Sequence, residues 1–298
     1  MSIKTEKDML FLKWLRENGA CYPKIDWPSN KTVSGIRGAV AIESIETNEP
    51  MLEIPIKLMI TPPLALSDPE IGHLLSESSD LLYGDAMLTL YIMYEIRKEE
   101  KSFYFPFLQT LPEPSSATKW SDEMVRGLQD PLMVAKIKSK KSTMRFLYMR
   151  TVQRMCTKYP DVFPEQEYSF ELFRFAWETI QARAFGKRLP WSALVPFADC
   201  LNHSNVQTKY DFNVGGNGLF RLFPTGSNSY NRGSEVFNSY GRRANDNLLL
   251  DYGFSILDNE WDFVELCFQV GEIDESDFED DSAEWTYRFS DKAHLLHR

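Results

Sequence analysis

The stretch PFADCLNHSNV, Pro196 to Val206, sets an Asp, an Asn and a His into an apolar run at close spacing. Asp199, Asn202 and His203 are candidates for a metal site, for a catalytic set, or for side chains that hold a bend together. A metal site would need further ligands, but the chain has four histidines, and no HExxH or paired-cysteine spacing accompanies His203. A hydrolytic triad would need a nucleophile on a turn such as GxSxG, which the sequence lacks. The residue types alone leave the role of this stretch open.

The composition narrows the class of protein. A chain of 298 residues can bury one sizeable core, or one core with an inserted subdomain. A formal net charge of −10 argues against a nucleic-acid binder and is compatible with a basic polypeptide as partner. The four cysteines form no CxxC pair, so neither a zinc cage nor a disulfide framework is expected. With no signal-peptide pattern and no apolar run of membrane-spanning length, we expect a soluble intracellular protein.

Hydrophobic spacing predicts strands at both ends of a helical block. Lys7 to Asn18 has the spacing of a helix, and Val33 to Pro62 has the short apolar bursts of small strands. The Gly-rich GGNG predicts a hairpin between Lys209–Val214 and Leu219–Phe223. Neither β half has enough strands for its own core, so we predict an α+β domain split by a helical insert. The insert is expected to contain helices at Asp85–Glu99, Ser121–Lys140, Met144–Thr157 and Tyr168–Ala184.

Three further segments are informative when they are considered together with Pro196–Val206. GIRGAVA, Gly35 to Ala41, is a glycine-punctuated turn that runs into a strand. QARAF, Gln181 to Phe185, closes the last helix of the insert, and FNSYGRRANDNLLLDYGF, Phe237 to Phe254, places Tyr240 and Tyr252 about a short helix. Taken one at a time, the three segments are explained equally well by structural roles: an ordinary turn, a helix end with a Phe in the core, and two tyrosines in the core.

In this order, the segments resemble the SET-domain methyltransferases, and more closely the Rubisco large-subunit methyltransferase-like branch. The resemblance rests on GIRGAVAIESIETNEPMLEIP, SFYFPFLQTLP, RAF, PFADCLNHS and YGRRANDNLLLDYGF. It implies a SET-domain β-fold with a pseudoknot, in which the NHS segment passes beneath a loop formed by the later Tyr segment. It also implies four parts: residues 1–62 as the first part of the domain, 63–185 as the insert, 186–256 as the second part, and 257–298 as an acidic segment.

By this resemblance the opening stretch is a cofactor-binding turn rather than a metal site. Asn202 and His203 would contact S-adenosyl-L-methionine, with Asp199 supporting them. A guanidinium can grip a carboxylate in bidentate fashion, so Arg183 suits the carboxylate of the cofactor. The turn of Gly35, Ile36 and Arg37 would also lie against the cofactor.

The resemblance places the reacting lysine in a narrow aromatic channel. Phe185, Tyr240 and Tyr252 would surround it, and Tyr240 would also border the cofactor. We expect Tyr240 to be the catalytic residue, because its hydroxyl can orient the amine beside the transferring methyl group.

The implied function is a protein-lysine N-methyltransferase that acts on a non-histone protein by direct in-line transfer. Members that methylate histidine look polar at the position of Phe185 and lack the Tyr matching Tyr252, so lysine is favoured, with histidine as an alternative. A non-histone substrate is favoured because the zinc-binding Cys cluster of the histone-directed enzymes is missing. We expect a monomer in the cytoplasm or nucleus, with an organelle left open, acting on a lysine in a basic protein segment and binding neither nucleic acid nor membrane.

The chain departs from the family pattern at several places, and the altered glycine turn and the short C-terminal part support another alternative. Gly35 stands where an acidic residue often precedes the glycine turn, and Ala182 replaces a Ser found in some relatives. Residues 255–298 follow YGF, where the family usually continues into a long helical substrate-binding domain. A catalytically silent SET fold that binds a protein partner would also fit these features.

Overall fold

The computed structural model describes residues 4–33 and 35–264. The chain divides into two compact units, Met1–Asp262 and Phe263–Arg298, and the structure below is that of the first. Most of the predicted acidic segment 257–298 lies outside the described residues. No helix in the described part of the chain is long and apolar enough to cross a membrane.

Strands precede and follow a helical block, as the sequence predicts. The strands are β1 (Ile25–Ser29), β2 (Gly38–Ala41), β3 (Leu52–Pro55), β4 (Asn202–His203), β5 (Thr208–Phe212), β6 (Leu219–Pro224) and β7 (Phe237–Asn238). The helices are α1 (Glu6–Glu17), α2 (Pro62–Leu66), α3 (Gly72–Ser76), α4 (Ala86–Arg97), α5 (Phe105–Leu108), α6 (Asp122–Arg126), α7 (Pro131–Arg150), α8 (Val152–Lys158), α9 (Phe170–Arg183) and α10 (Asn245–Tyr252). The α+β class and the hairpin across GGNG are confirmed.

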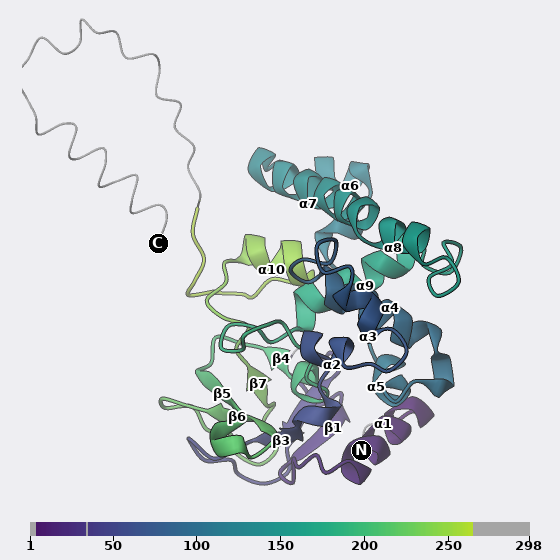
Figure 1. Ribbon diagram of the computed structural model, residues 1–298. Coiled ribbons are helices and arrows are strands. Elements are labelled where there is room, and N and C mark those ends of the chain that lie inside the picture. Colours follow the sequence, from purple (N-terminus) through teal and green to yellow (C-terminus); the bar gives the residue numbers. More distant parts are fainter. Residues whose placement is uncertain (1–3, 34, 265–298) are drawn as a thin grey trace, which may run out of the picture. The chain divides into compact units, whose positions relative to one another are not determined.

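The strands form three small sheets whose partners come from opposite ends of the sequence. In the three-stranded sheet, β6 lies between β3 and β5 and is antiparallel to both, while β1 pairs with β2. The short strands β4 and β7 run parallel, with Asn202 opposite Phe237 and His203 opposite Asn238. Figure 1 shows these strands gathered in the lower part of the molecule, with α4 and α6–α9 above them.

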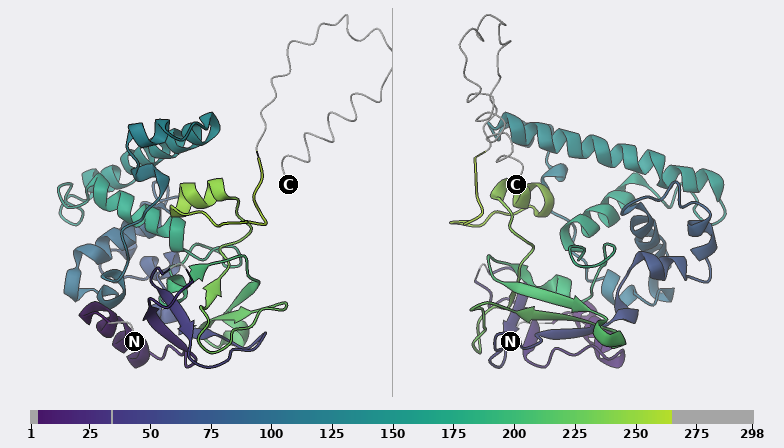
Figure 2. Two further views of the ribbon diagram at one scale, coloured as in Figure 1. Left: turned by 180° about the vertical axis from the view of Figure 1, so that it is seen from behind. Right: turned by 60° about the vertical axis from the view of Figure 1, so that its left-hand side comes forward.

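The helical block breaks at other places than the spacing predicts. The expected helix Ser121–Lys140 is wrong: α6 ends at Arg126, and a new helix begins at Pro131. Asp130 caps that helix, because its Oδ1 accepts hydrogen bonds from the amides of Leu132 and Met133, and proline suits the first helical position. The resulting α7 runs on to Arg150 as a long outer helix (Figure 2), so the expected start of a helix at Met144 is also wrong.

One continuous apolar core joins the strands to the helices. Phe11 of α1 is fully buried and lies edge-on to Trp27 of β1, with 5.5 Å between ring centroids. It also contacts Phe107 of α5 at 5.7 Å, so α1 ties the first strands to the helical block. The boundaries predicted at residues 62 and 185 stay a prediction, because this core crosses both of them.

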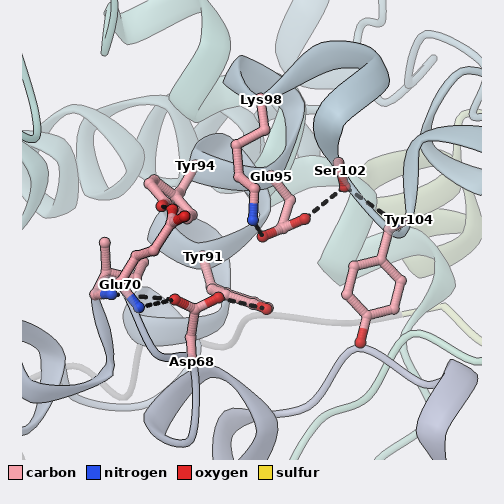
Figure 3. Close-up of polar contacts among 9 residues, drawn as sticks. Asp68, Glu70, Tyr91, Tyr94, Glu95, Lys98, Ser102 and Tyr104 are labelled. Atoms are coloured by element: carbon pink, nitrogen blue, oxygen red, sulfur yellow. Dashed lines mark hydrogen bonds and ion pairs between the residues drawn. The ribbon is translucent and has the colours of Figure 1, made fainter.

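A partly buried polar network fastens the start of the helical block to α4 (Figure 3). Asp68 accepts hydrogen bonds from the amides of Glu70 and Ile71 and from the Tyr91 hydroxyl at 3.3 Å. Burial raises the pKa of Tyr91, so this hydroxyl stays protonated and donates. One turn further along α4, the buried Glu95 binds Lys98 at 3.0 Å and also accepts a hydrogen bond from Ser102.

We expect Glu95→Ala to lower the free energy of unfolding by about 1.5–3 kcal/mol, because it leaves buried hydrogen-bond partners of a charged group unsatisfied. Urea unfolding monitored by circular dichroism measures this loss. Glu100→Ala is the control, since Glu100 is exposed just beyond the same helix, and it is expected to change stability by less than about 0.5 kcal/mol. Equal effects of the two substitutions would show that the Glu95 network contributes nothing to stability.

Candidate active site

The stretch Pro196–Val206 begins with a strained bend. Phe197 has φ +73°, which is unusual for a bulky residue, and its side chain is fully buried. The ring stacks on Tyr22, with centroids 3.9 Å apart and planes 22° from parallel. This packing holds the backbone in its uncommon conformation and turns the following residues toward β4.

Asp199 is buried just after this bend and pairs with the last residue of α9. Nη1 of Arg183 donates to the Asp199 carbonyl oxygen at 2.9 Å and to its Oδ2 at 3.2 Å. Burial raises the pKa of the Asp199 carboxyl, and the neighbouring Arg183 guanidinium opposes that rise. Burial also raises the pKa of Cys200 well above its ordinary value, so this thiol stays protonated. The pair therefore joins α9 to the bend.

Three stacked rings follow from the parallel pairing of β4 with β7. His203 stacks on Tyr240 with centroids 4.9 Å apart, and Tyr240 stacks on Tyr252 of α10 at 5.1 Å. Nδ1 of His203 accepts a hydrogen bond from the Tyr240 amide at 3.1 Å, and the Tyr240 hydroxyl donates to the Leu201 carbonyl at 2.9 Å. Tyr240 is thus fixed at both its backbone and its hydroxyl.

The environment sets the protonation state of these rings. Burial raises the pKa of Tyr240, and Arg183 only partly offsets the effect, so the Tyr240 hydroxyl stays protonated at neutral pH. Burial lowers the pKa of His203, which favours the neutral imidazole. Nδ1 lies 3.1 Å from the Tyr240 amide nitrogen and 3.3 Å from the Asn238 carbonyl oxygen, and Nε2 is buried with no hydrogen-bond partner among the described residues.

The glycine turn is held against β4 by a buried carboxylate. Nδ2 of Asn202 donates to the Arg37 carbonyl at 3.3 Å and to Glu235 Oε1 at 2.8 Å. The other oxygen of Glu235 accepts the amide of Val33 at 2.7 Å, so Glu235 links both sides of the turn to Asn202. A Cβ on Gly38 would lie 2.5 Å from Asn202 Nδ2, which explains the need for glycine there.

The side chains of the glycine turn do not point toward Asn202. Gly35 has φ +70° and open space around it, and Ile36 is 58% exposed. The Arg37 guanidinium pairs with Asp8 at the start of α1 and lies 4.3 Å from the centroid of the Trp27 ring. The Arg37 side chain therefore anchors the turn to α1 and β1, and its backbone carbonyl faces Asn202.

A cavity of about 1020 Å³ brings several predicted residues together. Arg183, Phe185, Asp199, Tyr240 and Tyr252 line it. Its lining does not include Gly35, Ile36, Arg37, Asn202 or His203. Among residues 4–33 and 35–264, no group of three or more His, Cys, Asp or Glu side chains is placed to hold a metal ion.

The aromatic wall of the cavity is rigidly packed. Phe185 lies edge-on to Tyr210 and Phe220, with centroid separations of 5.5 and 5.1 Å. A backbone bridge between Phe185 and Ala193 fixes the start of the loop that leaves α9. The ring that we predicted beside the reacting amine is thus supported by the β5–β6 hairpin.

Sequence reasoning missed Glu235 and Gly38. Glu235 is 5% exposed, although a lone Glu before an apolar strand is normally solvent-facing. Gly38 carried the weaker signal of a second glycine after Gly35, but its contact with Asn202 joins residues far apart in the chain. Neither partner can be identified from local spacing.

Comparison with known proteins gives relatives with stated activities. No protein-family model matches the sequence. The Rubisco large-subunit N-methyltransferase of Pisum sativum chloroplasts is 29% identical over 274 residues, covering 89% of this chain and 54% of the relative. The chloroplast fructose-bisphosphate aldolase-lysine N-methyltransferase of Arabidopsis thaliana is 28% identical, covering 89% and 55%. The actin-histidine N-methyltransferase of Mus musculus is 26% identical, covering 88% and 45%.

Solved structures share the fold. Rubisco large-subunit methyltransferase bound to sinefungin and monomethyllysine gives a TM-score of 0.73 at 28% identity, covering 85% of this chain and 57% of that one. The SET domain of the same enzyme bound to lysine and AdoHcy also gives 0.73, at 25% identity, covering 84% and 57%. The predicted SET-domain fold is therefore confirmed. The chain spans about half the length of the curated relatives it matches.

Proposed function

Because the chain belongs to the Rubisco large-subunit methyltransferase-like branch of the SET-domain proteins, we propose that it methylates a lysine side chain of a non-histone protein with S-adenosylmethionine. The observation that carries this proposal is the single cavity that contains Arg183, Phe185, Tyr240 and Tyr252. An aromatic wall suits a lysine side chain, and a guanidinium suits the carboxylate of the cofactor.

The cavity suits the cofactor in size and in donor groups. Its volume of about 1020 Å³ lies at the upper end of the range for small-molecule sites, roughly 300–1,000 Å³. The Arg183 side chain keeps 24% of its surface exposed while Nη1 is held by Asp199, so it is oriented before any ligand arrives. When bound, S-adenosylmethionine supplies an activated methyl group on sulfur. Contacts of the cofactor with Gly35, Ile36, Arg37, Asn202 and His203 stay predictions.

The protonated hydroxyl of Tyr240 is suited to orient an amine rather than to deprotonate it. It already donates its hydrogen to the Leu201 carbonyl, so its oxygen is free to accept an N–H of the substrate amine. That contact would direct the nitrogen lone pair away from the tyrosine. A lysine must lose its proton before it reacts, which costs roughly 4–5 kcal/mol at pH 7. The apolar rings of Phe185 and Tyr252 lower this cost, since desolvation disfavours the ammonium form.

Lysine is the acceptor that the cavity favours over histidine. Both aromatic side chains that support lysine in the sequence, Phe185 and Tyr252, line the cavity. The relatives include enzymes named for lysine and enzymes named for histidine, so the acceptor must be identified directly. The monomeric state and the cytoplasmic or nuclear location stay predictions.

Two measurements in series test the proposal. Calorimetry should show micromolar binding of S-adenosylmethionine and of its demethylated product to the folded chain. Incubation with methyl-labelled cofactor and a proteome extract should then place label on lysine Nζ, located by mass spectrometry of the modified peptide. Cofactor binding with label on histidine would show that the acceptor is histidine and not lysine. A folded chain that binds no cofactor would favour the catalytically silent, partner-binding alternative.

A further inference from the structure

The wall of the active-site cavity carries an excess of positive charge. Five cationic side chains line it in addition to Arg183: Lys187, Arg188, Lys209, Arg242 and Arg243. They come from three segments, namely the loop after α9, strand β5, and the loop before α10. Once the Arg183–Asp199 pair is set aside, only Asp85 and Glu260 oppose them in the lining.

Within the described chain, no carboxylate forms an ion pair with any of these five cations. Lys209 binds the neutral Asn48 at 3.3 Å and lies above the Phe223 ring, and Arg242 lies 4.4 Å from the centroid of Trp261. The Asp85 carboxylate accepts a hydrogen bond from Gln181 at 3.1 Å. Within residues 4–33 and 35–264, the positive charge of these five side chains is therefore not balanced by ion pairs.

Neither reactant of the proposed reaction accounts for this field. S-adenosylmethionine carries one carboxylate, for which Arg183 suffices, together with a positive sulfonium and a positive ammonium. The target lysine is itself a cation before it reacts. Five further cations would repel both, so their natural counterpart is a group of carboxylates elsewhere on the substrate.

Resting on the proposed function, we infer that the substrate segment around the target lysine is acidic. Lys187, Arg188, Lys209, Arg242 and Arg243 would receive carboxylates on the residues that flank the lysine. An acidic flank thus holds the target lysine at the cavity through charge complementarity.

This inference runs against the basic substrate segment predicted from net charge. Residues 265–298 contain ten acidic and three basic residues, so most of the formal charge of −10 belongs to that stretch. The charge of the whole chain therefore says little about the charge around the cavity.

Three peptides test the inference with the full chain. Each carries one lysine in the same short core, flanked on both sides by glutamate, by glutamine or by arginine. The glutamate peptide should have a KM roughly tenfold or more below that of the glutamine peptide at low salt, and the arginine peptide should be the poorest. The advantage should shrink as ionic strength rises.

A charge-reversed variant locates the effect. Lys187→Glu with Arg188→Glu should remove or invert the order of KM among the three peptides. Lys7→Glu with Lys13→Glu is the matched control, since it makes the same change of charge on exposed positions of α1, away from the cavity. Equal loss of preference in both variants would attribute the effect to overall charge and overturn the inference.

Peptide binding measured without turnover distinguishes the proposed methyltransferase function from the inference of an acidic substrate segment. Fluorescence anisotropy of a labelled glutamate peptide should show binding that the Lys187/Arg188 variant loses. Methylation of all three peptides with equal KM would overturn the inference and leave the proposed function standing. Binding of the acidic peptide without methylation of any lysine peptide, despite bound cofactor, would overturn the proposed function and support the acidic-segment site.

Discussion

Replacing Tyr240 by Phe is expected to lower kcat by roughly 100-fold or more, because losing the group that orients the amine misplaces it relative to the methyl donor. The affinity for S-adenosylmethionine should change little, since the ring remains stacked between His203 and Tyr252 and the Tyr240 amide remains bound to His203. Single-turnover kinetics and calorimetry measure the two effects separately.

Tyr148→Phe is the matched control for this substitution. The Tyr148 hydroxyl donates to the Tyr168 carbonyl at 2.9 Å, the same bond at the same length that Tyr240 makes with Leu201. Each variant should lose about 1 kcal/mol of stability, but only Tyr240→Phe should lose turnover. If Tyr240→Phe weakens cofactor binding as much as it slows transfer, the hydroxyl is structural and the catalytic assignment is wrong.

Adding one methyl group at Gly38 is expected to disrupt the glycine turn. In Gly38→Ala the new Cβ would lie 2.5 Å from Asn202 Nδ2 and 2.8 Å from Thr32 Cγ2. Asn202 would have to leave Glu235 and the Arg37 carbonyl, so the free energy of unfolding should fall by about 1–3 kcal/mol. Cofactor binding should weaken roughly tenfold or more, since every misfit of about 1.4 kcal/mol costs one factor of ten. Thermal unfolding and calorimetry give the two values.

Gly186→Ala controls for the loss of a glycine. Its added Cβ meets Ser192 Oγ at 3.6 Å, an ordinary contact, so its stability should change little. A double-mutant cycle of Gly38→Ala with Asn202→Ala isolates the clash, because removing the Asn202 side chain makes room for the methyl group. Strict additivity in that cycle would mean that the two residues do not interact and that the turn is held in another way.

The sequence predicts the kinds of structure and the fold family better than it predicts the contacts. Alternating apolar bursts and the GGNG turn locate β5 and β6, and helical spacing locates α1, α4 and α9. The break between α6 and α7 was missed although its signal, Asp130 before Pro131, is a standard helix start. There the hydrophobic spacing continued across the break and outweighed the cap.

The family resemblance predicts which residues form the candidate site, but it does not predict the hydrogen bonds and strand pairings that hold them. Arg183, Phe185, Tyr240 and Tyr252 meet at one cavity, but nothing in local spacing shows that Arg183 is held by Asp199. The role of Glu235 depends on the pairing of Val40 with Glu235 across almost the whole domain. Such long-range pairings carry no periodic signature, so they become visible only in three dimensions.

The pairing of β3 with β6 affects how the chain folds while it is being synthesised on the ribosome. β3 begins at Leu52 and β6 at Leu219, so at the usual speed of synthesis, about 5–20 residues per second, roughly 10–30 s pass before the partner leaves the ribosome. During that time β3, whose Leu52 and Ile54 are buried in the finished protein, lacks its partner strand. The nascent chain therefore carries an unpaired apolar strand, a feature that promotes aggregation, until its second half is made.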